Sequence, residues 1–103
     1  MNDYPALRRF FGAYLHEDWS DEFPDEWAAA DEFARGEPLE APNFGSEMGR
    51  LFTNYTEEGQ LRHVLLYDFG AAILIEHKGW KYRDWLQSMA DHVQKAVEHP
   101  QAS

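Results

Sequence analysis

The sequence predicts a single all-α domain, and three observations support this. Apolar residues recur at helical spacing in several segments, Pro and Gly residues separate those segments, and the links between them are short. The chain has 103 residues, of which 44% are hydrophobic and 16% aromatic, which is enough for one domain with a buried core. We therefore expect residues 1–103 to form one compact domain of four to five helices.

Two helices are expected in the N-terminal third. The first covers residues 2–15, where Pro5 suits the first helical turn. Gly12 costs this helix about 1 kcal/mol relative to Ala, unless another backbone packs closely there. The second covers residues 24–36, with Pro at its start and Gly at its end. Apolar residues form one face of each helix: Leu7, Phe10, Phe11, Tyr14 and Leu15 in the first, and Trp27, Ala30, Phe33 and Ala34 in the second.

Three further helices are expected along the rest of the chain. Residues 44–55 form the third, which Asn43 or Ser46 can cap. Thr56 can cap a fourth that carries Glu residues in its first turn. The last covers residues 80–98 and shows the clearest apolar period, carried by Tyr82, Trp85, Leu86, Met89, Val93, Ala96 and Val97.

The segment 69–77 is ambiguous. Gly70 can end a helix, whereas Ile73–Ile75 fits either a short buried strand or a turn of a core helix. A short extended segment near residues 71–76 is therefore an open alternative to continuous helix.

The net charge is −10, and almost all of the negative excess lies between Glu17 and Glu40. This segment has ten acidic residues and one basic residue, Arg35. The segment is either a solvated surface or a docking face for a basic partner, where association is steered. A negative surface does not suit direct binding of nucleic acid or of an anionic membrane. The candidate partner contacts are the acidic residues expected to be exposed: Asp21, Glu22, Asp25, Glu26, Asp31 and Glu32.

No catalytic or metal-binding pattern stands out. The chain has no Cys, and its five His residues form no recognisable ligand spacing. Its Ser residues lie in no nucleophile motif, and there is no Gly-rich phosphate loop. We expect no cofactor, no metal and no catalytic residue. The N-terminal residues lack signal-peptide features and no apolar run is long enough to cross a bilayer, so we expect a cytoplasmic protein.

One cluster, from Tyr14 to Trp19, is unusual. A histidine beside a tryptophan at a helix end, as His16 is here, can act as a switch or a catalytic base. The alternative is a structural histidine that bonds to backbone or carboxylate groups while Trp19 packs beneath it. On the structural interpretation, Trp19→Ala costs about 3–5 kcal/mol if the ring is buried.

At this cluster the chain resembles a family of bacterial immunity proteins, the CdiI-type proteins of contact-dependent growth inhibition. The resemblance is carried by Tyr4-Pro5-x-Leu7, by Phe11-Gly12-Ala13-Tyr14-Leu15-His16-Glu17-Asp18-Trp19, and by Tyr82-Arg83-Asp84-Trp85-Leu86. It covers residues 4–35 and 80–97 well and residues 39–79 poorly. It implies that the shared residues serve the fold, among them Tyr14, His16, Asp18, Trp19, Tyr82 and Trp85.

The resemblance also implies a function. A protein of this family binds the C-terminal toxin domain of its cognate CdiA protein and blocks it. We expect a nuclease-type toxin whose basic groove the acidic face occupies, in a 1:1 complex formed by a chain that is monomeric when free. Two other hypotheses stay open on the residues alone: an acidic regulatory or adaptor domain that binds another basic protein, and a small acid–base enzyme that uses His16 with a carboxylate.

Overall fold

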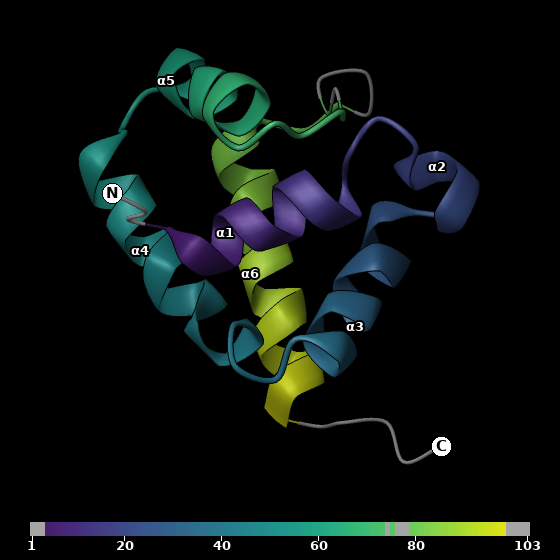
Figure 1. The fold of residues 1–103 in the computed structure, drawn as a ribbon. Coiled ribbons are helices and arrows are strands. Elements are labelled where there is room, and N and C mark those ends of the chain that lie inside the picture. Colours follow the sequence, from purple (N-terminus) through teal and green to yellow (C-terminus); the bar gives the residue numbers. More distant parts are fainter. Residues whose placement is uncertain (1–3, 74, 76–78, 99–103) are drawn as a thin grey trace.

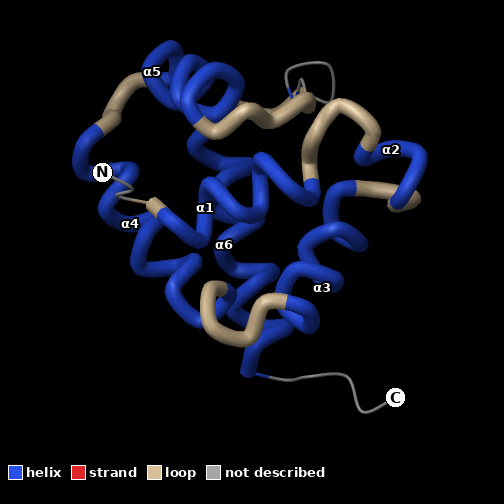
Figure 2. The backbone as a smooth tube through the Cα atoms, in the orientation of Figure 1, coloured by secondary structure: helices blue, strands red, loops and turns tan. Residues whose placement is uncertain are grey.

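The computed structural model describes residues 4–73, 75 and 79–98. All regular structure in these residues is helical, and Figure 2 shows helices joined by loops with no strand among them. The expected all-α class is confirmed.

Six α-helices lie within the described residues, rather than the four to five expected. The additional helix, α2, has four residues and buries none of them, so it has no apolar period by which the sequence could reveal it. Two of the other helices continue as π-helical turns. In chain order the elements are α1 (Pro5–Arg9), η1 (Phe10–Tyr14), α2 (Trp19–Glu22), α3 (Glu26–Gly36), η2 (Ala41–Asn43), α4 (Phe44–Asn54), α5 (Glu58–His63), η3 (Val64–Asp68) and α6 (Tyr82–Glu98).

Two helices start at other residues than predicted, because side chains bond to the backbone N–H groups at the helix start. The N-cap of α5 is Glu57 and not Thr56, because Glu57 and Gln60 form a reciprocal capping box. The predicted last helix starts at Tyr82 and not at Trp80. There the two Glu58 carboxylate oxygens accept the N–H groups of Tyr82 at 2.6 Å and of Arg83 at 3.0 Å.

The other helix ends are close to the predicted ones. The first helix begins at Pro5, and of the predicted span residues 2 and 3 lie outside the described part. Asn43 is the N-cap residue of α4, but neither it nor Ser46 caps the helix in the expected way. The Asn43 side chain makes no capping bond, and the Ser46 hydroxyl donates to the Asn43 carbonyl at 3.1 Å.

The ambiguous segment is neither a strand nor a continuous helix where the structure describes it. Ala71–Ile73 has no regular structure, and the Ala72 N–H donates to the Leu15 carbonyl at 2.8 Å. Ile73 and Ile75 are buried in the core. Residues 74 and 76–78 lie outside the described residues, so the extended segment expected near 71–76 is followed only in part.

α6 is the central helix, with α3 and α4 packed against it and α1 crossing in front in the view of Figure 1. Aromatic rings fill the space between them. The ring centroid of Phe10 lies 5.2 Å from that of Phe33 and 5.5 Å from that of Phe44, and Trp85 is fully buried. Gly12 fits the close approach of η1 to the chain after η3, because a Cβ there would lie 3.3 Å from the Phe69 carbonyl oxygen. The sequence predicts that Gly12 destabilises this helix unless another backbone packs closely there, and the backbone at Phe69 does so.

α3 is rotated by about one residue from the predicted face. Ala30 and Phe33 are buried as expected, but Glu26 and Ala29 complete the buried face. Trp27 and Ala34 are only partly buried, at the edge of the core. The buried carboxylate of Glu26 is accommodated because it accepts the indole N–H of Trp85 at 3.2 Å.

Candidate partner-binding surface

The carboxylates of the acidic segment differ in what they contact. Glu26 is 2% exposed and bonds to Trp85, so the expectation that it is exposed is wrong. Asp25 is exposed but serves the start of α3, where its Oδ1 accepts the N–H of Ala28 at 2.8 Å. These two carboxylates therefore already have structural roles in the free chain.

The outer side of α3 carries two acids that pair with neighbours. Asp31 Oδ1 lies 2.8 Å from Nε2 of His92 on α6, and Glu32 forms an ion pair with Arg35 one turn along α3. Both carboxylates keep much of their surface in solvent, with the Asp31 side chain 59% exposed. They can meet a partner, although Glu32 is already partly neutralised by Arg35.

The acids around α2 have no permanent cation among the described residues. Glu17, Asp18, Asp21 and Glu22 are all exposed. Among the described residues the only ionic contact of these four side chains joins Glu22 Oε1 to His16 Nε2 at 3.3 Å, and it is ionic only when His16 is protonated. Figure 1 shows α2 at the edge of the molecule, away from the central helix. Four carboxylates that lack a permanent cation among the described residues therefore lie around α2.

α2 is held in place by Trp19 and His16. The Trp19 indole N–H donates to the Ala72 carbonyl at 3.2 Å, and its backbone N–H donates to the His16 carbonyl at 2.9 Å. His16 Nδ1 accepts the backbone N–H of Asp18 at 3.1 Å, which places the proton of a neutral ring on Nε2, facing Glu22. Both ring nitrogens of His16 are thus used in local contacts.

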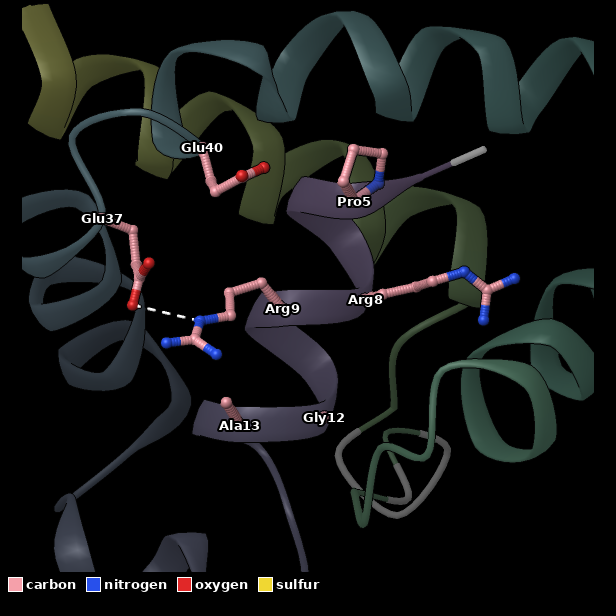
Figure 3. Close-up of a pocket in the computed structure, with 7 residues that line it drawn as sticks. All are labelled: Pro5, Arg8, Arg9, Gly12, Ala13, Glu37 and Glu40. Carbon is pink, nitrogen blue, oxygen red and sulfur yellow. Dashed lines mark hydrogen bonds and ion pairs between the residues drawn. The ribbon is translucent and has the colours of Figure 1, made fainter. Parts of the chain in front are cut away.

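A hollow in the described part of the molecule lies elsewhere, between α1–η1 and the link from α3 to η2 (Figure 3). Arg9 Nε lies 3.2 Å from Glu37 Oε2, and the Tyr14 hydroxyl donates to the same oxygen at 3.1 Å. Burial, with the bond to Glu37, raises the pKa of Tyr14. His16, the residue on which the acid–base hypothesis rested, does not line this hollow. The lining residues are Pro5, Arg8, Arg9, Gly12, Ala13, Glu37 and Glu40.

Metal binding finds no support in the part of the chain that the structure describes. No three His, Asp or Glu side chains there are grouped so that they could hold an ion. No described helix combines the length and the apolar surface that a membrane span needs. The feature that the described residues display most clearly is a charged surface around α2 and α3.

The sequence comparison decides the family. The family described as CdiI immunity protein matches residues 3–93, most of the chain. The chain belongs to the CdiI immunity family. Its members are immunity proteins, which bind and neutralise a cognate CdiA toxin and are generally not enzymes. No curated protein and no solved structure matches the chain.

The two sequence motifs of the immunity protein occupy different depths. Tyr82 and Trp85 of the closing motif are buried under the other helices. In the opening motif Tyr14, His16 and Trp19 are partly buried and Asp18 is exposed. Because Trp19 is partly buried, the cost of about 3–5 kcal/mol expected for a buried ring does not carry over to it in full. The assignment of all six residues to the fold stays a prediction.

Sequence reasoning missed an aromatic surface on the immunity protein. The partly buried ring of Trp27 lies 6.4 Å from Trp80 and 5.5 Å from His92, and Trp80 is 37% exposed. We call Trp27, Trp80 and His92 the aromatic surface. The sequence signal for it was weak: Trp27 fits a helical period that is one residue out of register, and Trp80 precedes its helix.

Proposed function

We propose that this immunity protein neutralises a nuclease-type toxin domain by placing the exposed acids of α2 and α3 in the toxin's basic substrate groove. The observation that carries the proposal is the group of exposed carboxylates at α2 that have no permanent cation among the described residues: Glu17, Asp18, Asp21 and Glu22. A nuclease groove binds phosphates with Lys and Arg, and carboxylates can take the place of those phosphates.

The proposed contact keeps five of the six acids selected from the sequence. Asp21 and Glu22 lie at its centre, and Asp25, Asp31 and Glu32 border it along α3. Glu26 is left out, because its carboxylate is buried against Trp85. We further propose a 1:1 complex in the cytoplasm, formed by a single-domain chain that is monomeric when free.

Association kinetics test the proposal. The binding partner in this test is the C-terminal toxin domain of the cognate CdiA protein. The double variant Asp21→Lys/Glu22→Lys is compared with Asp68→Lys/Glu98→Lys, which makes the same change in net charge on η3 and at the end of α6. Both pairs replace exposed side chains. We expect the α2 pair to slow association at least about tenfold at low salt, and the control pair by less than about threefold.

The same variants are then tested for protection of cells that produce the toxin domain. We expect the α2 pair to protect poorly and the control pair to protect as well as the wild type. Equal association rates for the two pairs, with full protection by both, would move the contact away from α2. Light scattering of the free chain and of the complex measures the proposed monomer and the 1:1 ratio.

A further inference from the structure

The aromatic surface is the one place where the structure describes two tryptophan rings that pack on each other and reach solvent beside an exposed carboxylate. Trp80 packs against Trp27, and Trp27 on α3 packs against His92 on α6. On its inner side Trp27 contacts the buried ring of Trp85 at 6.4 Å. The core therefore fixes one side of Trp27, while its outer side and part of Trp80 face solvent.

The two tryptophan rings of this surface differ from three other aromatic rings of the chain in their contacts with cations. Arg8, Arg50 and Arg83 stand over Phe69, Tyr4 and Phe52, at 5.2, 5.5 and 4.5 Å from the ring centroids. No described cation stands over Trp27 or Trp80 in this way, although Lys81 follows Trp80 in the chain. Tryptophan is the best acceptor of such cation–π contacts. The strongest acceptors are thus left for a cation from outside the described residues.

An exposed carboxylate lies beside the aromatic surface, in contact with His92. Asp31 is one helical turn after Trp27 on α3, and its 59% exposed side chain contacts His92, which itself packs on Trp27. A cation above the indole rings would therefore find the ring faces below it and a negative charge at its side. Lys and Arg side chains have this chemistry, and an Arg guanidinium can also stack flat on a ring.

We infer that an Arg or Lys side chain of the toxin domain docks on the aromatic surface, against Asp31, and that this contact is a centre of the binding energy. The inference rests on the proposed binding of a basic toxin domain and adds a second role to it. The carboxylates at α2 speed the encounter, and the tryptophans hold the complex, because buried Trp residues carry a large share of interface energy. α3 follows α2 directly in the chain, so one partner can contact both.

Substitution of Trp80 separates the two roles. We expect Trp80→Ala to weaken binding of the toxin domain by at least about 30-fold, mainly through faster dissociation, while the association rate keeps its salt dependence. Trp80→Phe, which keeps a ring, should lose less. Tyr67→Ala and Leu39→Ala are the matched controls, because these side chains are 69% and 84% exposed on other parts of the surface. We expect both controls to bind within about threefold of the wild type.

Two measurements guard against a variant that simply unfolds. Circular dichroism compares the helix content of each variant with the wild type, and Asp31→Asn, which alters an exposed side chain, should also speed dissociation. Hydrogen exchange of the wild-type chain, free and bound to the toxin domain, needs no variant. We expect slower exchange in residues 27–31 and 88–92 when the toxin domain is bound.

The outcomes distinguish the inference from the proposed function. If the wild-type chain fails to bind the toxin domain, the proposed function is wrong and this inference with it. If the wild type binds but folded Trp80→Ala dissociates at the wild-type rate, with unchanged exchange at 27–31, only the inference is overturned. Fast dissociation of Trp80→Ala, beside normal dissociation of the two controls, supports it.

Discussion

Glu47 illustrates how its neighbours set the role of a single carboxylate. It lies on α4, is 2% exposed, and its Oε1 accepts the backbone N–H groups of Ala6 at 2.8 Å and Leu7 at 3.1 Å. These N–H groups belong to the first turn of α1, which has no side-chain cap of its own. Glu47 therefore caps α1 from a helix that lies forty residues away in the sequence.

Burial of Glu47 has a consequence for stability. Burial raises the pKa of Glu47, although the Leu7 and Ala6 N–H groups and the charge of Arg50 act in the other direction. A carboxyl with a raised pKa in the folded chain stabilises the fold most below its unfolded value. That contribution is lost as the pH rises through the folded value.

The first prediction is that the stability of the wild type relative to Glu47→Gln falls as the pH rises above 4.5, the ordinary pKa of this group. The glutamine keeps an acceptor for the α1 N–H groups but does not ionise. Urea unfolding of both proteins between about pH 4 and 7 gives the two free energies of unfolding. A difference that grows in favour of the wild type with rising pH would show that the N–H donors outweigh burial.

The sequence could not separate neighbouring residues of α3. Glu26 and Trp27 exchange the roles expected of them, because Ala29 and Ala30 let the apolar period be drawn in either of two registers. The indole N–H of Trp85, from a distant helix, hydrogen-bonds to the buried Glu26 and so helps to offset the cost of burying its carboxylate. Such a long-range partner leaves no trace in the local pattern, which is why the exposure of Glu26 was predicted wrongly.

At the scale of elements, Glu58 does for α6 what Glu47 does for α1. Its two oxygens accept the N–H groups of Tyr82 and Arg83, and so join the start of α5 to the start of α6. The negative charge also favours the positive end of the longest helix that the structure describes. Part of the acidic composition therefore serves helix starts and not a partner.

The second prediction concerns this cap. Glu58→Ala should lower the free energy of unfolding by about 1–2 kcal/mol, since two N–H groups lose their acceptor and the helix dipole loses its counter-charge. Glu17→Ala is the control: it removes an exposed acid that makes no hydrogen bond or ion pair with any described residue, and should change stability by less than about 0.5 kcal/mol. Thermal or urea unfolding measures both. Equal effects would mean that α6 starts without help from Glu58.

The long elements were predictable and the short ones were not. α3, α4 and α6 have 11, 11 and 17 residues, so each repeats its apolar spacing several times. α2 has four residues and no buried face, so no period can reveal it. No local pattern predicted the π-helical turn of η1. The sequence did indicate that Gly12 needs a closely packed backbone beside it, and the structure has one.

At the scale of the whole molecule, the charges are sorted by position. Arg8, Arg50 and Arg83 are tied down over aromatic rings around α1, α4 and the start of α6. Four exposed acids that have no permanent cation among the described residues lie around α2, on the edge of the fold (Figure 1). A molecule polarised in this way turns one face toward a basic partner before contact, which raises the rate of association.

The same crowding should weaken the free chain. Like charges repel one another in the folded state, and salt screens that repulsion over about 10 Å at about 0.1 M. Asp21→Lys/Glu22→Lys and Asp68→Lys/Glu98→Lys each bring the net charge from −10 to −6, because each substitution changes it by two. They differ in whether the relief falls inside the crowded region, and each pair removes one contact: that of Glu22 with His16, or the hydrogen bond from Gln94 to Glu98.

The third prediction is therefore that salt stabilises the wild type and that the α2 pair removes most of this response. Raising NaCl from about 0.05 to about 0.5 M should increase the melting temperature of the wild type by roughly 4–8 °C, which corresponds to about 1 kcal/mol for a domain of this size. The α2 pair should melt higher than the wild type at low salt and respond weakly to added salt, because its two new cations lie among the remaining acids. The η3 and α6 pair should keep most of the wild-type response. If both pairs lose it equally, the repulsion belongs to the net charge of the whole chain and not to α2, and the same α2 carboxylates would lose their special claim to steer the toxin.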